Sequence, residues 1–176
     1  RRNIMHFNAK PDDIFVILSG DQLYRMDFSK MVEEHLARGA EVTVAAKPVS
    51  TDEASGLGLL SIGEDARITD FVEKPTDPEV ISSLVPEELK STDGQCDRVL
   101  ASMGIYVFNA SSMFEALKGD SKDFGKEIIP SLVQDKDIRC HVFDDYWEDI
   151  GTVRAFFDAN LQLTEPVPSF NFYDED

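Results

Sequence analysis

Hydrophobic and polar positions change period from one segment of the chain to the next, and this change is the main local signal of secondary structure. Short apolar runs rich in β-branched residues predict strands, and apolar residues that recur every three or four positions predict helices. Strands are predicted over residues 14–20, 41–49, 56–62, 67–73, 99–108 and 138–143, and helices over residues 27–39, 78–84, 111–119, 124–135 and 152–163. The fourth helix is expected to be interrupted or restarted at Pro130. The polar stretch 85–98 has neither period and is predicted to be a mobile loop.

Two of the predicted helices have a well-defined apolar face. In segment 27–39 the face consists of Phe28, Met31, Val32 and Leu36. In segment 152–163 it consists of Val153, Phe156, Phe157 and Leu161. Asp27 and Thr152 are suitable N-caps, and Gly39 is suited to end the first of these helices.

Strands and helices interleave along the chain, which indicates an α/β fold with a largely parallel central sheet. In such sheets ligands bind at the carboxyl ends of the strands. Polar residues that core packing does not require stand at or near these predicted ends: Asp21, Glu73, Lys74, Ser102 and Asp149. These residues are therefore candidates for a binding site.

The composition of the chain excludes several classes of function. Among its 176 residues 17 are Lys or Arg and 34 are Asp or Glu, so the formal net charge is −17. Such a chain repels nucleic acid and anionic membranes, and no apolar run is long enough to span a bilayer. The three histidines are isolated in the sequence, so no zinc site is expected. A phosphorylated ligand would need a few well-placed bases and a metal ion.

The stretch "YWEDIGT", residues 146–152, combines features that neither a core nor a loop explains. Two large aromatic residues run directly into two acids, followed by a glycine and a threonine. An acid beside Trp147 favours water, whereas a solvated loop has little use for the tryptophan. We therefore expect Asp149 to be held there to bind a ligand.

Five blocks of sequence occur in an order that resembles one enzyme family. They are "ILSGDQLYRMD", "FVEKP", "ASMGIYVF", "DFGKEIIP" and "YWEDIGT". In this order they resemble the glucose-1-phosphate adenylyltransferases, also called ADP-glucose pyrophosphorylases, over residues 14–173. The resemblance implies a Rossmann-like nucleotide-diphospho-sugar transferase fold, with part of the catalytic domain over residues 1–163 and a linker over 164–176. The family's glycine-rich N-terminal loop and its C-terminal β-helix domain have no counterpart here, so we expect a piece of a longer protein.

The resemblance also implies an activity. The complete protein is expected to form ADP-glucose and pyrophosphate from ATP and glucose 1-phosphate, with Mg²⁺ as cofactor, for the synthesis of glycogen or starch. It is further expected to be a homo- or heterotetramer that binds neither nucleic acid nor membrane. Its expected location is the cytoplasm, or the plastid in a plant or alga.

The resemblance assigns the catalytic roles to three residues, Asp21, Lys74 and Asp149. The two aspartates correspond to the family's metal ligands, which suits the preference of Mg²⁺ for one or two carboxylates. Glu73 is expected to accept hydrogen bonds from neighbouring sugar hydroxyls, and Lys74 to bind the sugar phosphate as a point charge. Pro75 is expected to bias Lys74 to an extended conformation. The structural alternatives are a turn residue for Asp21, a residue near a helix start for Asp149, and a surface ion pair for Glu73 and Lys74.

Further substrate contacts are implied by the same resemblance. They are Ser102, Asp123, Phe124 and Trp147, with Trp147 offering an apolar face to the sugar ring. Asp123 is equally suited to be a plain helix cap. Gly58 would let the backbone approach a ligand closely, and a β-bulge is the equal alternative.

Two other functions remain open at the level of the sequence. One is a sugar-1-phosphate nucleotidyltransferase that uses another nucleotide, such as a UDP-glucose- or dTDP-glucose-forming enzyme. The other is a non-catalytic regulatory subunit, in which catalytic groups would be lost. The presence of Asp21, Lys74 and Asp149 argues against that loss in this part of the protein.

Overall fold

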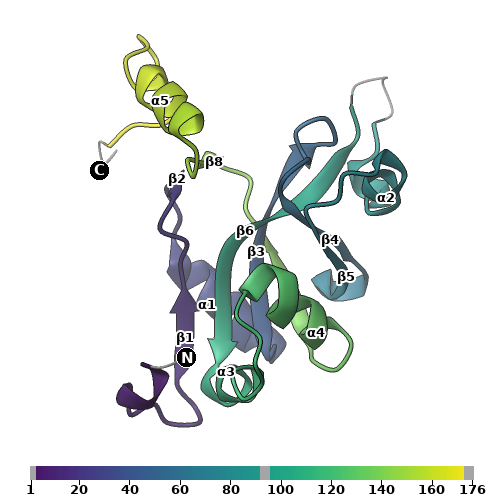
Figure 1. Cartoon of the computed structure of the whole chain (residues 1–176), viewed down its shortest axis with the longest axis vertical. Helices are drawn as coiled ribbons and strands as arrows, with labels where there is room; N and C mark the ends of the chain where they lie inside the picture. Colours follow the sequence, from purple (N-terminus) through teal and green to yellow (C-terminus); the bar gives the residue numbers. More distant parts are fainter. Residues whose placement is uncertain (1–2, 92–95, 173–176) are drawn as a thin grey trace. The chain divides into compact units, whose positions relative to one another are not determined.

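The computed structural model describes residues 3–91 and 96–172. The chain forms two compact units, each built from two stretches of sequence. The first unit comprises Arg1–Leu18 and Phe28–Phe143, and the second comprises Ser19–Asp27 and Asp144–Asp176. Strands and helices alternate along the chain, as the sequence pattern predicts (Figure 1).

The first unit is built on a six-stranded sheet. Its strands are β1 (Ile14–Ile17), β3 (Val42–Ser50), β4 (Gly58–Ile62), β5 (Ile68–Glu73), β6 (Arg98–Asn109) and β7 (Ile138–Val142). The order is β5-β4-β6-β3-β7, with β1 paired to β6 outside this path. The long strand β6 is central: β3 follows one side of it, while β4 and then β1 pair with successive parts of the other side.

The predicted largely parallel sheet is wrong. Among the described strands only β3 and β7 pair in parallel, and the other pairs of the sheet are antiparallel. Helix α1 does connect two strands of the same direction, β1 and β3, as an interleaved pattern indicates. However, β6 is inserted between them in the opposite direction, and β4 and β5 form a hairpin. Periodicity reports which segments are strands, but it does not report which strand is inserted between two others.

The helices of the first unit cover both faces of the sheet. They are α1 (Phe28–Arg38), α2 (Pro78–Ser83), α3 (Ala110–Ala116), a π-helical turn η4 (Phe124–Ile128) and α4 (Ile129–Val133), with 3₁₀ turns η1 (Ile4–His6), η2 (Glu64–Ala66) and η3 (Glu87–Leu89). Each predicted helix of this unit is therefore present. The expected restart near Pro130 is also present, since the chain changes from the π-helical turn to α-helix at Ile129.

The main hydrophobic core lies between the sheet and helices α3 and α4. Val44 and Phe108 on the sheet pack there with Met113 of α3 and Ile129 of α4. A smaller cluster forms where α2 covers β4 and the start of β6. Helix α1 buries Met31 and contacts β3, β6 and β7. Packing on both faces of the sheet therefore fixes the positions of the strand ends.

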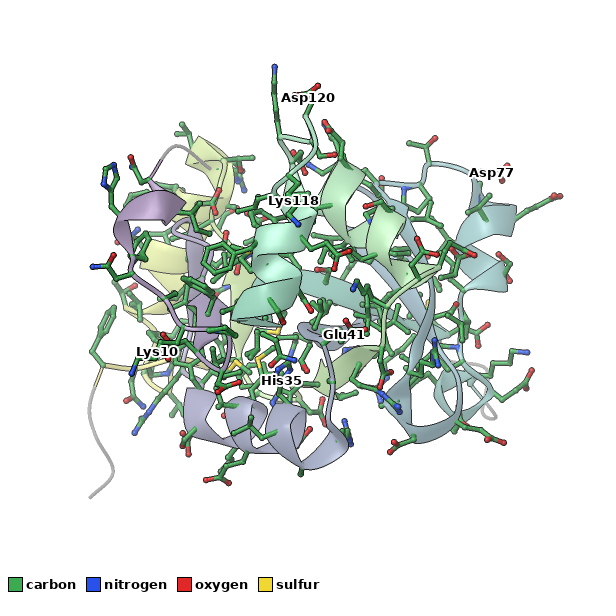
Figure 2. All side chains as sticks on the ribbon, turned by 90° about the horizontal axis from the view of Figure 1, so that it is seen from below. Lys10, His35, Glu41, Asp77, Lys118 and Asp120 are labelled. Atoms are coloured by element: carbon green, nitrogen blue, oxygen red, sulfur yellow. The ribbon has the colours of Figure 1, made fainter. Side chains whose placement is uncertain are left out.

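One polar side chain is buried beneath α1. His35 is 1% exposed, and its two ring nitrogens lie 2.8 Å from the Thr43 hydroxyl and 3.1 Å from the Asn109 side-chain oxygen. Figure 2 shows His35 on the inner side of α1, whereas Asp77 and Asp120 point outward. Leu36, predicted for the apolar face of this helix, is 59% exposed, so the histidine takes the inner position.

The described residues of the second unit form a short two-stranded sheet and one helix. Strands β2 (Gln22–Tyr24) and β8 (Trp147–Asp149) pair antiparallel, and α5 (Val153–Gln162) follows. Thr152 caps α5 as predicted, because its hydroxyl oxygen accepts a hydrogen bond from the Ala155 amide. The three-residue strand β2 was not predicted from the sequence.

Two further expectations concern the loop and the membrane. The stretch 85–98 contains the turn η3 and the first residue of β6, so it is more structured than predicted, and its residues 92–95 lie outside the described part. Within the described ranges no helix has both the length and the apolar character needed to cross a bilayer.

Candidate active site

A first cluster of candidate residues surrounds the carboxylate of Glu73. This residue ends β5 and stands opposite Gly58 of β4. Its Oε2 atom lies 2.8 Å from the position that a Cβ on Gly58 would occupy, and 2.9 Å from the corresponding position on Gly125. The carboxylate therefore occupies a narrow slot between two glycines, one from a strand and one from the turn η4.

Hydroxyl and aromatic groups gather beside this slot. The side chains of Ser102 and Tyr106, both on β6, share a hydrogen bond, and Phe124 stacks on the Tyr106 ring with centroids 5.6 Å apart. Burial raises the pKa of the Tyr106 hydroxyl, and the nearby charges of Glu73 and Asp123 add to this, while the bond with Ser102 opposes it. The hydroxyl thus stays protonated, able to donate a hydrogen bond. The structure thus brings together five predicted residues and the unpredicted Tyr106; the five are Gly58, Glu73, Ser102, Asp123 and Phe124.

Asp123 has a structural role in this cluster. Its Oδ1 atom accepts a hydrogen bond of 2.9 Å from the Lys126 amide, and it caps the turn η4. The cap that the sequence allowed is therefore present, and the substrate contact implied by the resemblance stays a prediction. The cap also fixes the carboxylate at the edge of the cluster, where its negative charge helps to raise the pKa of the Tyr106 hydroxyl.

Lys74 follows Glu73 and is exposed. Its φ is +49°, so the predicted extended conformation is wrong. The Lys74 amide donates a 3.1 Å hydrogen bond to the Leu57 carbonyl, which continues the pairing between the two strands of the hairpin. This tertiary bond outweighs the local preference imposed by Pro75. A left-handed conformation is strained for a lysine, and such strain is often found at functional positions.

A second cluster is formed by Asp21 and Asp149 in the second unit. Asp149 pairs in register with Gln22, and the Ile150 amide donates to the Asp21 carbonyl. A Cβ on Gly151 would lie 3.1 Å from Asp21 Oδ2 and 3.0 Å from Asp149 Oδ1, so these two oxygens are no more than about 6 Å apart. The structure therefore brings together two aspartates that are far apart in the sequence.

Hydrogen bonds orient both carboxylates. The Ser19 hydroxyl donates to Asp21 Oδ1 at 2.8 Å, and the Gly151 amide donates to Asp149 Oδ1 at 2.9 Å. Both aspartates are exposed. Two like charges at this separation repel each other, and a divalent cation would remove that repulsion.

The chemistry of this donor set fits Mg²⁺. The ion typically takes one or two protein carboxylates and completes its shell with water and substrate oxygens. In the described residues no group of three or more His, Cys, Asp or Glu side chains is placed to hold a metal. A two-carboxylate site of this kind is therefore suited to a cation that also binds the phosphates of a substrate.

Trp147 lies on the same short sheet as Asp149. It is 8% exposed and pairs in register with Tyr24. Within the described ranges its indole Nε1 and the side-chain oxygen of Gln22 are buried atoms without a hydrogen-bond partner. Tyr146, in contrast, has a packing role, since its hydroxyl donates to Gln162 and its ring packs against Phe170.

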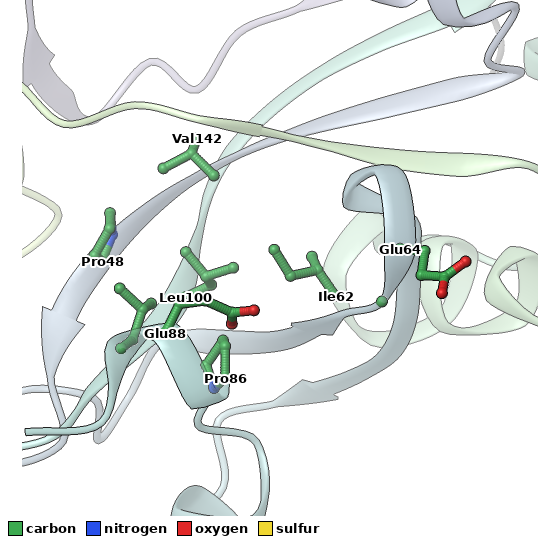
Figure 3. Close-up of a pocket in the computed structure, with 9 residues that line it drawn as sticks. Pro48, Ile62, Glu64, Pro86, Glu88, Leu100 and Val142 are labelled. Atoms are coloured by element: carbon green, nitrogen blue, oxygen red, sulfur yellow. The ribbon is translucent and has the colours of Figure 1, made fainter.

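A separate pocket lies elsewhere on the first unit (Figure 3). It encloses about 470 Å³ and is lined by Pro48, Ile62, Gly63, Glu64, Pro86, Glu88, Leu89, Leu100 and Val142. None of the predicted site residues lines it. Each of the two clusters, and not this pocket, is therefore a candidate for part of an active site.

An α/β fold with a close pair of exposed carboxylates and a second cluster of hydrogen-bonding groups is typical of an enzyme that acts on a phosphorylated substrate. The chain belongs to the nucleotidyl transferase family, whose sequence profile matches residues 2–166.

Curated relatives agree with this family. The chain is 42% identical to glucose-1-phosphate adenylyltransferase large subunit 1, chloroplastic/amyloplastic, of Zea mays, over 96% of this chain and 34% of that protein. It is also 42% identical to glucose-1-phosphate adenylyltransferase 2 of Vibrio cholerae serotype O1, over 90% of this chain and 40% of that protein. A third relative, glucose-1-phosphate adenylyltransferase of Dechloromonas aromatica, is 40% identical over 98% of this chain and 40% of that protein. The chain thus spans between a third and two-fifths of the length of these relatives.

Proposed function

We propose that the complete protein containing this chain is a glucose-1-phosphate adenylyltransferase, which forms ADP-glucose and pyrophosphate from ATP and glucose 1-phosphate. In this proposal residues 1–163 belong to the catalytic domain and residues 164–176 to a linker. The single observation that carries the proposal is the convergence of Asp21 and Asp149 around Gly151. The names of the relatives support this choice of substrates.

The sugar phosphate is held by the first cluster. Glu73 accepts hydrogen bonds from two neighbouring sugar hydroxyls, and the Lys74 ammonium binds the phosphate. Ser102 and Asp123 complete the polar contacts, while Phe124 and the backbone at Gly58 contact the ring. Trp147, which belongs to the second unit, is proposed as a further contact through its apolar face. The Tyr106 hydroxyl, hydrogen-bonded to Ser102, supports the orientation of the Ser102 contact.

The reaction is an in-line displacement. A phosphate oxygen of glucose 1-phosphate attacks the α-phosphorus of ATP and forms a new P–O bond, while the bond from that phosphorus to the bridging oxygen breaks and pyrophosphate leaves. Mg²⁺, when held by Asp21 and Asp149, offsets the negative charge on the phosphates. Lys74 contributes a fixed positive charge, and Glu73 fixes the orientation of the attacking group. Such positioning supplies much of the rate in phosphoryl transfer.

The proposal extends to the setting of the enzyme. The product would supply glucosyl units for glycogen or starch synthesis, in the bacterial cytoplasm or in a plastid. A homo- or heterotetramer is the proposed assembly of the complete protein.

A nucleotide panel tests this function. The complete protein is assayed for pyrophosphate release from glucose 1-phosphate and Mg²⁺ with ATP, UTP or dTTP. We expect ATP to support the highest kcat/KM. A preference for UTP or dTTP would make the protein a nucleotidyltransferase of another type. Absence of turnover with all three nucleotides would indicate a non-catalytic subunit.

A further inference from the structure

We propose that Gly125 is a positioning residue for Glu73, acting through the space left by its missing side chain. This inference rests on the proposed function, in which the Glu73 carboxylate binds the sugar hydroxyls. Gly125 is the second residue of the turn η4 and follows the capping residue Asp123 by two positions. It assigns a role to a glycine that touches neither the sugar nor the metal in the proposed mechanism.

The backbone does not require a glycine at this position. The glycines with positive φ among the described residues are Gly39, Gly56 and Gly104. Gly125 is outside this group, so an alanine could adopt its backbone conformation without strain. The need for glycine is therefore one of space.

The space at Gly125 is filled by the Glu73 carboxylate. A Cβ on Gly125 would lie 2.9 Å from Glu73 Oε2, which is closer than van der Waals contact allows, and 3.4 Å from Glu73 Cδ, at the short limit of ordinary contact. The next atom, Asp123 Oδ1, is at 3.6 Å, which is an ordinary contact. An added methyl group would thus act on a single neighbour, the end of the Glu73 side chain.

The opposite wall of the slot differs in this respect. A Cβ on Gly58 would meet Glu73 Oε2 at 2.8 Å, but it would also meet the Phe71 ring at 2.9 Å. Phe71 is 7% exposed and belongs to the main core. A substitution at Gly58 would therefore disturb core packing as well as the Glu73 carboxylate. A substitution at Gly125 would displace the carboxylate without disturbing the core.

The consequence for substrate binding follows from geometry. The two glycines confine the Glu73 carboxylate, so the side chain loses little further freedom when the sugar binds. Alanine at position 125 would push the carboxylate out of the slot while the fold stays intact. Misplacement of a binding group by about 1 Å can cost up to a hundredfold in rate.

The test compares Gly125→Ala with a matched control, Gly119→Ala, in the complete protein. Gly119 has ordinary φ, and a Cβ there would meet nothing within 4 Å. We expect Gly125→Ala to raise the KM for glucose 1-phosphate about tenfold or more, to leave the KM for ATP unchanged, and to melt within a few degrees of the control. Equal effects on both substrates, kinetics equal to those of the control, or loss of the fold would each overturn the inference.

A second variant separates positioning from general damage. Glu73→Asp shortens the side chain by one methylene, so the carboxylate no longer reaches the slot. In the Glu73→Asp background, Gly125→Ala is therefore expected to have no further effect on the KM for glucose 1-phosphate. Additive losses would overturn the inference. If the unsubstituted protein releases no pyrophosphate from ATP and glucose 1-phosphate, the proposed function fails, which is a different outcome.

Discussion

The two clusters of the candidate site are both built from carboxylates beside glycines, yet they differ in how complete they are. Glu73 lies in a slot closed on two sides, within a unit whose sheet is packed on both faces. Asp21 and Asp149 are exposed and face each other across Gly151 on a short two-stranded sheet. Packing alone defines the first arrangement. The second places two like charges close together, an arrangement that a divalent cation would stabilise.

This difference suits the two proposed tasks. A group that recognises sugar hydroxyls must have a fixed direction, which packing supplies before the substrate arrives. A pair that holds Mg²⁺ must admit an ion together with its water and phosphate ligands, which requires open carboxylates. The proposed sugar contact therefore rests on side-chain packing, whereas the proposed metal site rests on charge.

The largest expected effect is on the metal pair. Asp149→Asn should lower kcat about a hundredfold to a thousandfold, a loss similar to that caused by removing a strong electrostatic contact from an active site. The asparagine oxygen can still accept the hydrogen bond from Gly151, so the melting temperature should hardly change. Steady-state kinetics and Mn²⁺ binding measured by electron paramagnetic resonance check this.

The matched control for that variant is Asp144→Asn, an exposed acid of the same unit. It should keep full activity and unchanged Mn²⁺ binding. If Asp149→Asn binds Mn²⁺ as tightly as this control, the second cluster is not the metal site, and the contrast between the two clusters no longer holds.

The next effect concerns the phosphate contact of the first cluster. Lys74→Ala should weaken the binding of glucose 1-phosphate about tenfold to a hundredfold and leave the binding of ATP nearly unchanged. The reason is that a hydrogen bond to a charged group contributes roughly 1.5–3 kcal/mol. Separate KM values for the two substrates check this, with the exposed Lys118→Ala as control. Similar losses for both substrates would point to a general defect instead.

The smallest expected effect is a dependence of stability on pH, which we expect in the first unit and not in the second. Burial lowers the pKa of His35 below its usual 6.5, although the hydrogen bond with Asn109 opposes the shift. The folded state therefore binds fewer protons than the unfolded state just below pH 6.5, so this residue's contribution to stability is lost as the pH falls through that range. Thermal unfolding between pH 7.5 and 5 should show a drop in melting temperature that is reduced in His35→Leu.

The control for this measurement is His6→Asn, a substitution of an exposed histidine that should leave the pH dependence of the melting temperature unchanged. Hydrogen exchange should show early loss of protection in β3 and β6, which carry Thr43 and Asn109, and not in β2 and β8. An unchanged pH slope in His35→Leu would show that carboxylates, and not this histidine, dominate the response.

Much of the fold could be predicted from periodicity, because most helices and strands of the first unit bury one face. The helix α1 illustrates the limit, since His35 and not Leu36 takes the inner position through partners on β3 and β6. Helix α5 has an equally regular pattern, yet Phe156 and Phe157 are more than half exposed. A pattern identifies a helix and its apolar face, but tertiary contacts decide what that face meets.

The site could be predicted in part. Asp21 and Asp149 were identified through the order of the family-like blocks, and the strand pairing that brings them together could not be inferred because β2 has only three residues. Tyr106 was missed because it stands in a strand full of apolar residues. Gly125 was missed because a glycine that makes room for a carboxylate leaves no local signal. Its partner is 52 positions away, from 73 to 125.

The most direct test of the central proposal is a crystal structure of the complete protein with glucose 1-phosphate and Mg²⁺. The account predicts sugar hydroxyls hydrogen-bonded to Glu73, the phosphate beside the Lys74 ammonium, and Mg²⁺ about 2.0–2.1 Å from oxygens of Asp21 and Asp149. Glucose 1-phosphate bound in the separate pocket beside Leu100, or Mg²⁺ held by other carboxylates, would contradict it.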